Sequence, residues 1–272
     1  MSRHVANKVL GQHFLVDDNI LRVIERLADL DPADIVLEIG PGLGMLTVFL
    51  ADRVARVHAV ELDRSLEPRL GEALAGWENV SVVYGDALHL DLAALDPVPR
   101  KLVANLPYNV ATPIVVESLD GLPAIDSWCV MLQREVADRF FGEPGTKAYG
   151  AVSVLIQLAT ERTGFHPVSR EVFRPRPNVD SALLSFRRSG PLPPRYRELK
   201  RVVEGAFAHR RKTLPNSLEL ARVASRPQAV GALEAIGRRP DTRAEALEPA
   251  EFLALAAALH AALGLAQAEA PA

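Results

Sequence analysis

Residues 35–44 read IVLEIGPGLG, an apolar run that ends in three closely spaced glycines. The apolar residues 46–50 follow directly, so we predict a buried strand, a glycine corner and a helix. This arrangement begins a nucleotide-binding βαβ unit, in which glycines let the backbone approach a ligand closely. The corner Gly40-x-Gly42-x-Gly44 is tighter than the dinucleotide fingerprint, which disfavours a nicotinamide-dependent oxidoreductase.

Acidic residues follow the next two predicted strands. Residues 57–60 end at Glu61, which we expect to accept hydrogen bonds from both hydroxyls of a ribose. Residues 80–84 lead into Gly85-Asp86-Ala87, where Asp86 offers an acceptor for an adenine amino group. Each acid could instead be a polar residue that merely ends a strand. Ligand-compatible residues at three consecutive strand ends favour a nucleoside site at the carboxyl edge of the sheet.

The next apolar run, residues 101–104, ends at Asn105-Leu106-Pro107-Tyr108. Asn105 can accept a hydrogen bond and Pro107 cannot donate one, so this corner presents carbonyl oxygens. Tyr108 adds a ring on which a base could stack. Acceptors beside a stacking surface suit the exocyclic amino group of a nucleobase. The alternative is a turn in which the asparagine and proline only end the strand.

Composition is that of an ordinary globular protein, with 49% hydrophobic and 24% charged residues among 272. No apolar run is as long as a membrane span, and the N-terminus lacks the apolar core of a signal peptide, so we expect a cytoplasmic protein. The single cysteine, Cys129, excludes a disulfide framework and a cysteine-based zinc site. We expect it in a buried strand, and we expect no metal in the site.

The net charge of -3 conceals an asymmetry. Residues 1–132 contain 10 Lys and Arg against 19 Asp and Glu, whereas residues 133–215 contain 16 against 8. The excess of positive charge could belong to a solvated surface. Its spread over several predicted elements favours a face that binds phosphates.

Taken in order, residues 38–44, 61–63, 85–87 and 105–108 resemble the motifs of S-adenosylmethionine-dependent rRNA adenine N6-dimethyltransferases. The resemblance implies an α/β, Rossmann-like class I methyltransferase fold with a smaller C-terminal helical domain. Residues 11–15, Gly-Gln-His-Phe-Leu, are similar to the family's N-terminal cofactor motif, in which Asn is common at the position of His13. The cofactor-binding residues that the resemblance implies for S-adenosylmethionine are Gln12, His13, Leu15, Gly40, Gly42, Glu61, Leu62, Asp86, Ala87 and Asn105.

The target adenine is assigned by the same resemblance to the fourth motif. Asn105, Leu106, Pro107 and Tyr108 are expected to hold the base. Residues 173–181 are similar to the family's Phe-x-Pro-x-Pro segment, whose ring, Phe173, is expected on the opposite face of the base from Tyr108. Phe173 could also be a core residue in a loop stiffened by prolines.

Two later segments resemble the branch that modifies the small subunit: Tyr149–Val154 and the Arg-Arg-Lys-Thr-Leu motif at 210–214. They imply dimethylation of two adjacent adenines in the 3′-terminal hairpin of 16S rRNA, within an immature 30S subunit. We expect the protein to act as a monomer. The residues expected to bind RNA are Arg174, Arg176, Arg210, Arg211 and Lys212. The alternatives are a resistance-type enzyme acting on 23S rRNA and an assembly factor whose binding matters more than its catalysis.

The predicted domains are 1–189, the methyltransferase domain, and 190–264, the helical domain. The linker Gly-Pro-Leu-Pro-Pro at 190–194 separates them. Helical periodicity covers 199–207, and the Ala-rich stretch 252–263 predicts a last helix that ends at Gly264. We expect a disordered tail at 265–272.

Overall fold

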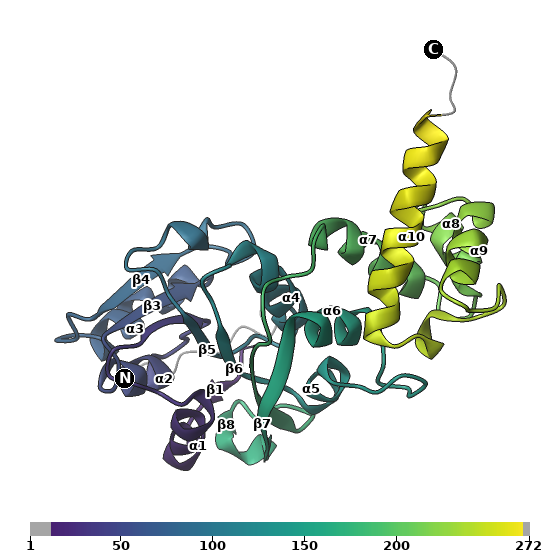
Figure 1. The fold of residues 1–272 in the computed structure, drawn as a ribbon. Coiled ribbons are helices and arrows are strands. Elements are labelled where there is room, and N and C mark those ends of the chain that lie inside the picture. The colour runs from purple at the N-terminus through teal and green to yellow at the C-terminus, as the bar shows by residue number, and fades with distance from the viewer. Residues whose placement is uncertain (1–11, 269–272) are drawn as a thin grey trace. The chain divides into compact units, whose positions relative to one another are not determined.

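The computed structural model describes the backbone of residues 12–268 and the side chains of residues 12–262 (Figure 1). The chain divides into two compact units. The sheet unit consists of the residues up to 137 together with 161–189. The helical unit consists of 138–160 together with the residues from 190 onward.

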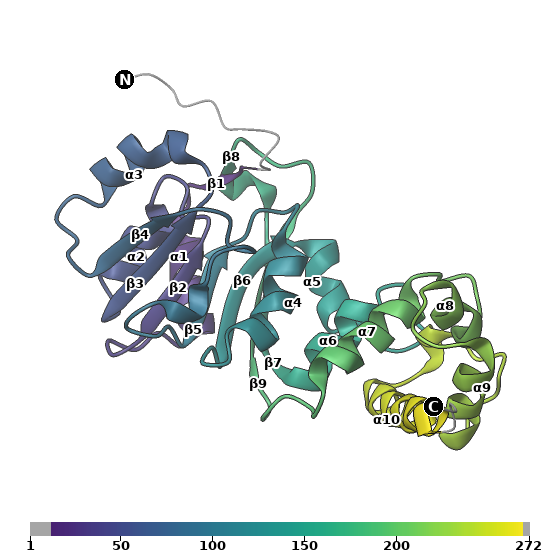
Figure 2. The ribbon, with the colours of Figure 1, turned by 90° about the horizontal axis from the view of Figure 1, so that it is seen from above.

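A seven-stranded sheet forms the framework of the sheet unit, in the order β4-β3-β2-β5-β6-β9-β7. The first five strands in this order pair in parallel, and β9 runs antiparallel to β6. Figure 2 shows β3, β2 and β5 side by side. Strand order reverses between β2 and β5, so ligands are expected at the carboxyl ends of these two strands. The strands are β2 (Ile35–Ile39), β3 (Arg56–Glu61), β4 (Val80–Tyr84), β5 (Lys101–Asn105), β6 (Ser127–Gln133), β7 (Thr160–Val168) and β9 (Ser181–Arg188).

The predicted strands at 35–39, 57–60, 80–84 and 101–104 are confirmed as β2 to β5, and the strand expected around Cys129 is β6. Their apolar runs are continuous because a parallel sheet is covered on both faces. Cys129 lies buried in β6, as expected. The helices of this unit are α1 (Asp18–Ala28), α2 (Met45–Ala51), α3 (Glu67–Ala73) and α4 (Ala111–Gly121), and α5 (Arg134–Phe140) crosses the unit boundary.

Helix α1 shows how the sequence sets these elements. Asp17 caps it, since its carboxylate accepts from the amide nitrogen of Asn19 at 2.8 Å. One face of the helix, which includes Ile20, Leu21 and Ile24, is buried. This face packs against β5, β6 and β9.

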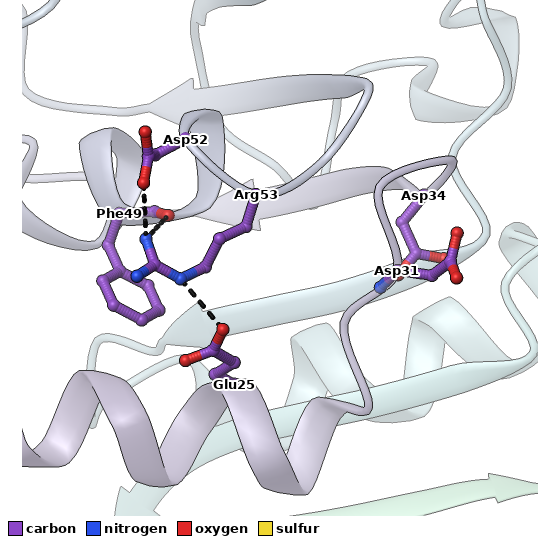
Figure 3. Close-up of polar contacts among 6 residues, drawn as sticks. All are labelled: Glu25, Asp31, Asp34, Phe49, Asp52 and Arg53. Atoms are coloured by element: carbon purple, nitrogen blue, oxygen red, sulfur yellow. Dashed lines mark hydrogen bonds and ion pairs between the residues drawn. The ribbon is translucent and has the colours of Figure 1, made fainter.

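Arg53 joins α1 to the end of α2 (Figure 3). Its Nε donates to Glu25 at 3.1 Å, its Nη1 donates to the carbonyl of Phe49 at 3.0 Å, and its guanidinium covers the Phe49 ring. In the turn before β2, the Asp34 carboxylate accepts from the amide nitrogen of Asp31 at 2.7 Å. These contacts fix both ends of the segment that carries the glycine corner.

A second, two-stranded sheet pairs β1 (Phe14–Leu15) with β8 (Phe173–Arg174), antiparallel. The amide nitrogen of Val16 extends the pairing by donating to the carbonyl of Val172 at 2.9 Å. The N-terminal motif therefore lies beside the Phe-x-Pro-x-Pro segment, although the two are far apart in the sequence.

The helical unit contains α6 (Ala151–Ala159), α7 (Tyr196–Phe207), α8 (Leu214–Leu220), α9 (Arg226–Ala235) and α10 (Pro249–Ala268). Helix α6 packs against α7 and α10, and α9 packs against α8 and α10. The Phe207 ring lies 5.8 Å from that of Tyr149 and 5.7 Å from that of Phe252. The predicted division placed all of 1–189 in the first domain. The structure corrects this for residues 138–160, which belong to the helical unit because α6 packs against α7 and α10.

Helix α10 corrects a second expectation. It continues through Gly264 to Ala268, so residues 265–268 are helical, and 269–272 lie outside the described residues. A glycine inside a helix costs only about 1 kcal/mol relative to alanine, and the alanines and leucines around it are strong helix formers. Within residues 12–268, no helix combines the length and apolar character needed to cross a membrane.

Tyr149 should make a measurable contribution to the stability of the helical unit. Its ring is fully buried, and its hydroxyl donates to the carbonyl of Leu247 at 2.8 Å. We expect Tyr149→Phe to lower the free energy of unfolding by about 1–2 kcal/mol, since a buried carbonyl loses its donor. Urea unfolding measures this difference, and an unchanged midpoint and slope would contradict it.

Candidate active site

A pocket lies at the point where the strand order reverses. Its walls come from the N-terminal motif and from the segments that follow β2, β3, β4 and β5. Of the residues predicted to bind the cofactor or the target base, all but one line this pocket: Gln12, His13, Leu15, Gly40, Gly42, Glu61, Leu62, Asp86, Ala87, Asn105, Leu106, Pro107 and Tyr108. Phe173 is absent from its lining.

The glycine corner requires glycine for two reasons. Gly40 and Gly42 have φ angles of +78° and +59°, which L side chains rarely adopt. A Cβ on Gly42 would also lie 2.9 Å from the Phe14 ring, which is too close, whereas one on Gly40 would make an ordinary contact with Pro107 at 3.4 Å. The backbone of the corner is thus packed between the N-terminal motif and the end of β5.

Glu61 lines the pocket and binds two backbone amides beside it. One carboxylate oxygen accepts from the amide nitrogen of Gly42 at 3.0 Å, and the other accepts from that of Asp63 at 2.8 Å. The side chain is buried, and this burial raises the pKa of Glu61. Each oxygen retains capacity for a further donor, as two adjacent hydroxyls of a ribose would require.

The wall beyond Glu61 fits an adenine. Leu62 lines the pocket and leaves 54% of its surface exposed, so it offers an apolar surface there. Asp86 accepts from the amide nitrogen of Leu88 at 3.0 Å and from His89 at 2.8 Å, and these hydrogen bonds lower the pKa of Asp86. An apolar surface beside an ionised acceptor suits the ring and the amino group of an adenine.

Glu38 is a further acid that lines the pocket, and it was not among the predicted site residues. It is 1% exposed, and its Oε2 has no hydrogen-bond partner among the described residues. Burial raises the pKa of Glu38 to about 8, and the neighbouring Glu61 adds to the increase. Only its place before Gly40 distinguished it in the sequence.

We therefore expect the stability of the protein to fall as the pH rises from about 4.5 to 8. In this range the unfolded chain has released the Glu38 proton, whereas the folded chain retains it. Glu38→Gln cannot ionise, so it should become more stable than the parent protein by roughly 3–5 kcal/mol near pH 8 and by little near pH 5. Urea unfolding without cofactor at several pH values tests this, and parallel pH profiles would refute it.

The corner after β5 is held by hydrogen bonds at both of its ends. The Nδ2 of Asn105 donates to the carbonyl of His13 at 3.0 Å, so its Oδ1 remains available as an acceptor. The Tyr108 hydroxyl and the Ser181 hydroxyl are hydrogen-bonded at 2.5 Å. Ser181 is buried at the start of β9, and the sequence alone did not connect it with Tyr108.

The described structure does not support the expected role of Phe173 as the second ring of a base clamp. Phe173 has no exposed surface and packs in the core with Leu15, Ile20 and Leu183. Its pairing with Leu15 in the β1–β8 ribbon turns the side chain inward. The alternative interpretation, a core residue beside stiffening prolines, is the one that the structure bears out.

Comparison with known proteins identifies the family of this chain. A family model described as ribosomal RNA adenine dimethylase matches residues 3–260. The chain belongs to this family. Ribosomal RNA adenine dimethylases are S-adenosylmethionine-dependent methyltransferases, and the chain is an enzyme of this class.

Relatives within the ribosomal RNA adenine dimethylase family match nearly the whole chain. The ribosomal RNA small subunit methyltransferase A of Rubrobacter xylanophilus is 46% identical over 91% of this chain and 93% of its own. That of Lactiplantibacillus plantarum is 43% identical over 93% of this chain and 90% of its own.

Solved structures confirm the predicted class I fold. A dimethyladenosine transferase from Plasmodium falciparum is 24% identical, with a TM-score of 0.74 over 89% of this chain and 96% of its own. The 23S rRNA methyltransferase ErmE is 31% identical, with a TM-score of 0.66 over 91% of this chain and 99% of its own.

The basic residues expected to contact RNA in this dimethylase lie in both units. Arg174 is exposed at the end of β8 and Arg176 is exposed just after it, and Arg176 pairs with Glu171 at 2.7 Å. In the helical unit, Arg211 and Lys212 are exposed before α8. The Nη2 of Arg210 donates to the carbonyl of Tyr149 at 3.0 Å, a structural contact that the sequence did not predict.

Proposed function

We propose that this chain binds S-adenosylmethionine in the pocket and dimethylates N6 of two adjacent adenines in the 3′-terminal hairpin of 16S rRNA. We further propose that it acts as a cytoplasmic monomer on the immature small subunit. The observation that carries this proposal is the corner Asn105–Tyr108, held at the reversal of strand order beside a pocket suited to a nucleoside.

The pocket residues divide into two groups. Glu61, Leu62 and Asp86 would hold the ribose and adenine of the cofactor, and the glycine corner would lie against the rest of it. When bound, S-adenosylmethionine supplies a methyl group on a sulfonium that leaves as a neutral thioether, so no acid is needed. Positioning of the adenine amino group by the chain should therefore supply most of the acceleration.

Asn105 and Pro107 would position that amino group. Their carbonyl oxygens can accept its two hydrogens, which turns the nitrogen lone pair toward the methyl group. Tyr108 would stack on the base, and such a contact contributes roughly 1–3 kcal/mol, comparable with the few kcal/mol needed to extrude a base. In the second round, a monomethylated amine has one hydrogen fewer, so one of these hydrogen bonds is lost.

Two observations favour the small subunit as substrate. The relatives at 46% and 43% identity carry the small-subunit name. In addition, the two segments that resemble the small-subunit branch contact each other through Arg210 and Tyr149. This contact holds the Arg210 side chain, and the neighbouring Arg211 and Lys212 can extend toward phosphates.

A second candidate is methylation of the large subunit, which the likeness to ErmE favours. The deciding experiment measures transfer of labelled methyl from S-adenosylmethionine to undermethylated 30S subunits, 50S subunits and free 16S and 23S rRNA, with analysis of the product nucleosides. Dimethyladenosine in 30S subunits alone supports the proposal. Label in 23S rRNA would support the second candidate, and no label in any RNA would contradict both.

A further inference from the structure

Ser181 lies where the antiparallel strand β9 enters the sheet. Because β9 runs against β6, its first residue lies beside the carboxyl end of β6, and Ser181 pairs there with Gln133. This is the edge of the sheet that carries the pocket. The backbone is held by a further hydrogen bond, in which the amide nitrogen of Arg134 donates to the carbonyl of Asp180 at 3.0 Å. The pairing of the sheet therefore sets the position of Ser181 without help from a ligand.

The Ser181 hydroxyl contacts the Tyr108 hydroxyl. Their separation of 2.5 Å is at the short end of the range for hydrogen bonds between hydroxyls. Ser181 is 1% exposed, so water does not compete for this bond. Within residues 12–262, neither hydroxyl has another hydrogen-bond partner. Removing either hydroxyl would therefore remove the same bond.

The Tyr108 ring depends on this bond for its direction. Tyr108 lies in the turn after β5, which is closed by the amide nitrogen of Val110 donating to the carbonyl of Pro107 at 3.1 Å. The turn fixes the backbone, and the side-chain torsions then decide where the ring points. Since Ser181 holds the hydroxyl, the ring is fixed at both of its ends before a base arrives.

A ring that is already ordered binds a base more readily than a mobile one. A side chain that becomes ordered only on binding weakens the interaction by roughly three- to tenfold, through the rotamer entropy that it loses. On a small subunit, many contacts outside the pocket determine binding, and the base enters the pocket afterwards. The benefit of an ordered ring should therefore appear in the rate of transfer on the bound subunit and not in KM.

We propose that Ser181 is a positioning residue for the target adenine, whose hydroxyl holds the Tyr108 ring as a preset surface for the base. The segment 173–181 is thereby connected with the corner after β5 through its last residue. This inference rests on the proposed function, because it assigns Tyr108 to the adenine.

The test is a double-mutant cycle in the full chain, with Ser181→Ala, Tyr108→Phe and the double variant. Tyr108→Phe keeps the ring and removes the same hydrogen bond from its other end. Ser185→Ala is the matched control, since Ser185 is a buried serine of the same strand whose hydroxyl accepts from Thr163 at 3.0 Å, and it does not line the pocket.

For each variant, thermal unfolding reports the fold, and calorimetry gives the Kd for S-adenosylmethionine. Single-turnover methylation of undermethylated 30S subunits gives the saturating rate and the subunit concentration at half of that rate. We expect Ser181→Ala and Tyr108→Phe each to lower the saturating rate by roughly three- to tenfold, with both the cofactor Kd and the half-saturating concentration within about twofold of the parent values.

The double variant should lose no more than about twofold beyond either single variant, because both changes remove one bond. Ser185→Ala should keep the parent rate within about twofold.

A second measurement observes the bond without methyl transfer. The chain has four tyrosines, so ¹³C at the hydroxyl-bearing ring carbon of tyrosine gives few NMR signals, and Tyr108→Phe identifies the one that belongs to Tyr108. Ser181→Ala should shift this signal, and Ser185→Ala should leave it in place.

Four results would overturn the proposal: an unchanged rate for Ser181→Ala, losses that multiply in the double variant, an increase of about tenfold or more in the cofactor Kd, or an unmoved Tyr108 signal in Ser181→Ala. If Ser181→Ala did not fold, Tyr108→Phe would still decide, since an unchanged rate would show that the bond is not needed. If the parent chain methylated no RNA, the proposed function would fail, whereas the NMR comparison would still show whether Ser181 holds the ring.

Discussion

Asn105→Ala should reduce kcat for methyl transfer by roughly 100- to 1000-fold, comparable with the loss of one preorganised hydrogen-bonding group in other active sites. The variant removes the acceptor that orients the adenine amino group, and it also removes the donor that binds the His13 carbonyl. Single-turnover methylation of 30S subunits at saturating S-adenosylmethionine measures the chemical step directly.

Asn109→Ala is the matched control. Asn109 lines the same pocket, but its side chain is exposed, and the proposed mechanism does not use it. Its rate should stay within about threefold of the parent value. An Asn105→Ala protein that folded and kept more than about a tenth of the parent rate would remove Asn105 from the mechanism.

Glu61→Ala should weaken binding of S-adenosylmethionine by about 100-fold or more. Two hydrogen bonds from ribose hydroxyls to a carboxylate contribute roughly 1.5–3 kcal/mol each, and about 1.4 kcal/mol corresponds to a factor of ten. The change also leaves the amide nitrogens of Gly42 and Asp63 without their acceptor, so the corner itself loses support. Calorimetric titration measures the effect.

Glu72→Ala provides the control, since it removes an exposed carboxylate from α3. It should leave the Kd within about twofold of the parent value. Glu61→Gln retains one acceptor and should fall between the parent and the alanine variant. Equal affinities for Glu61→Ala and the parent protein would place the ribose elsewhere.

The sheet and the pocket could be predicted from the sequence because local signals and topology agree. Continuous apolar runs identified the parallel strands, and the polar residues at their ends could only meet at one edge. Gly40, Glu61, Asp86 and Asn105 are each weak signals alone. Together they mark four strand ends that the fold brings to one pocket.

Contacts between distant segments could not be predicted in the same way. Phe173 was assigned to the base because of its motif, yet the β1–β8 pairing turns it into the core. The position of His13 beside Pro175 and Tyr108 depends on the same pairing. Nothing in the periodicity of a two-residue strand indicates its partner.

The grouping of residues 138–160 with the helical unit has a consequence for how the protein is made. The strands of the sheet unit are all present once Ser189 has been synthesised, but α6 is made before α7 and α10, the helices that cover it. Its buried side chains, among them Val154, Leu155 and Ile156, must wait until α10 emerges. A gene cut after residue 189 would encode this helix without α7 and α10, so the buried face of α6 would be exposed in that fragment.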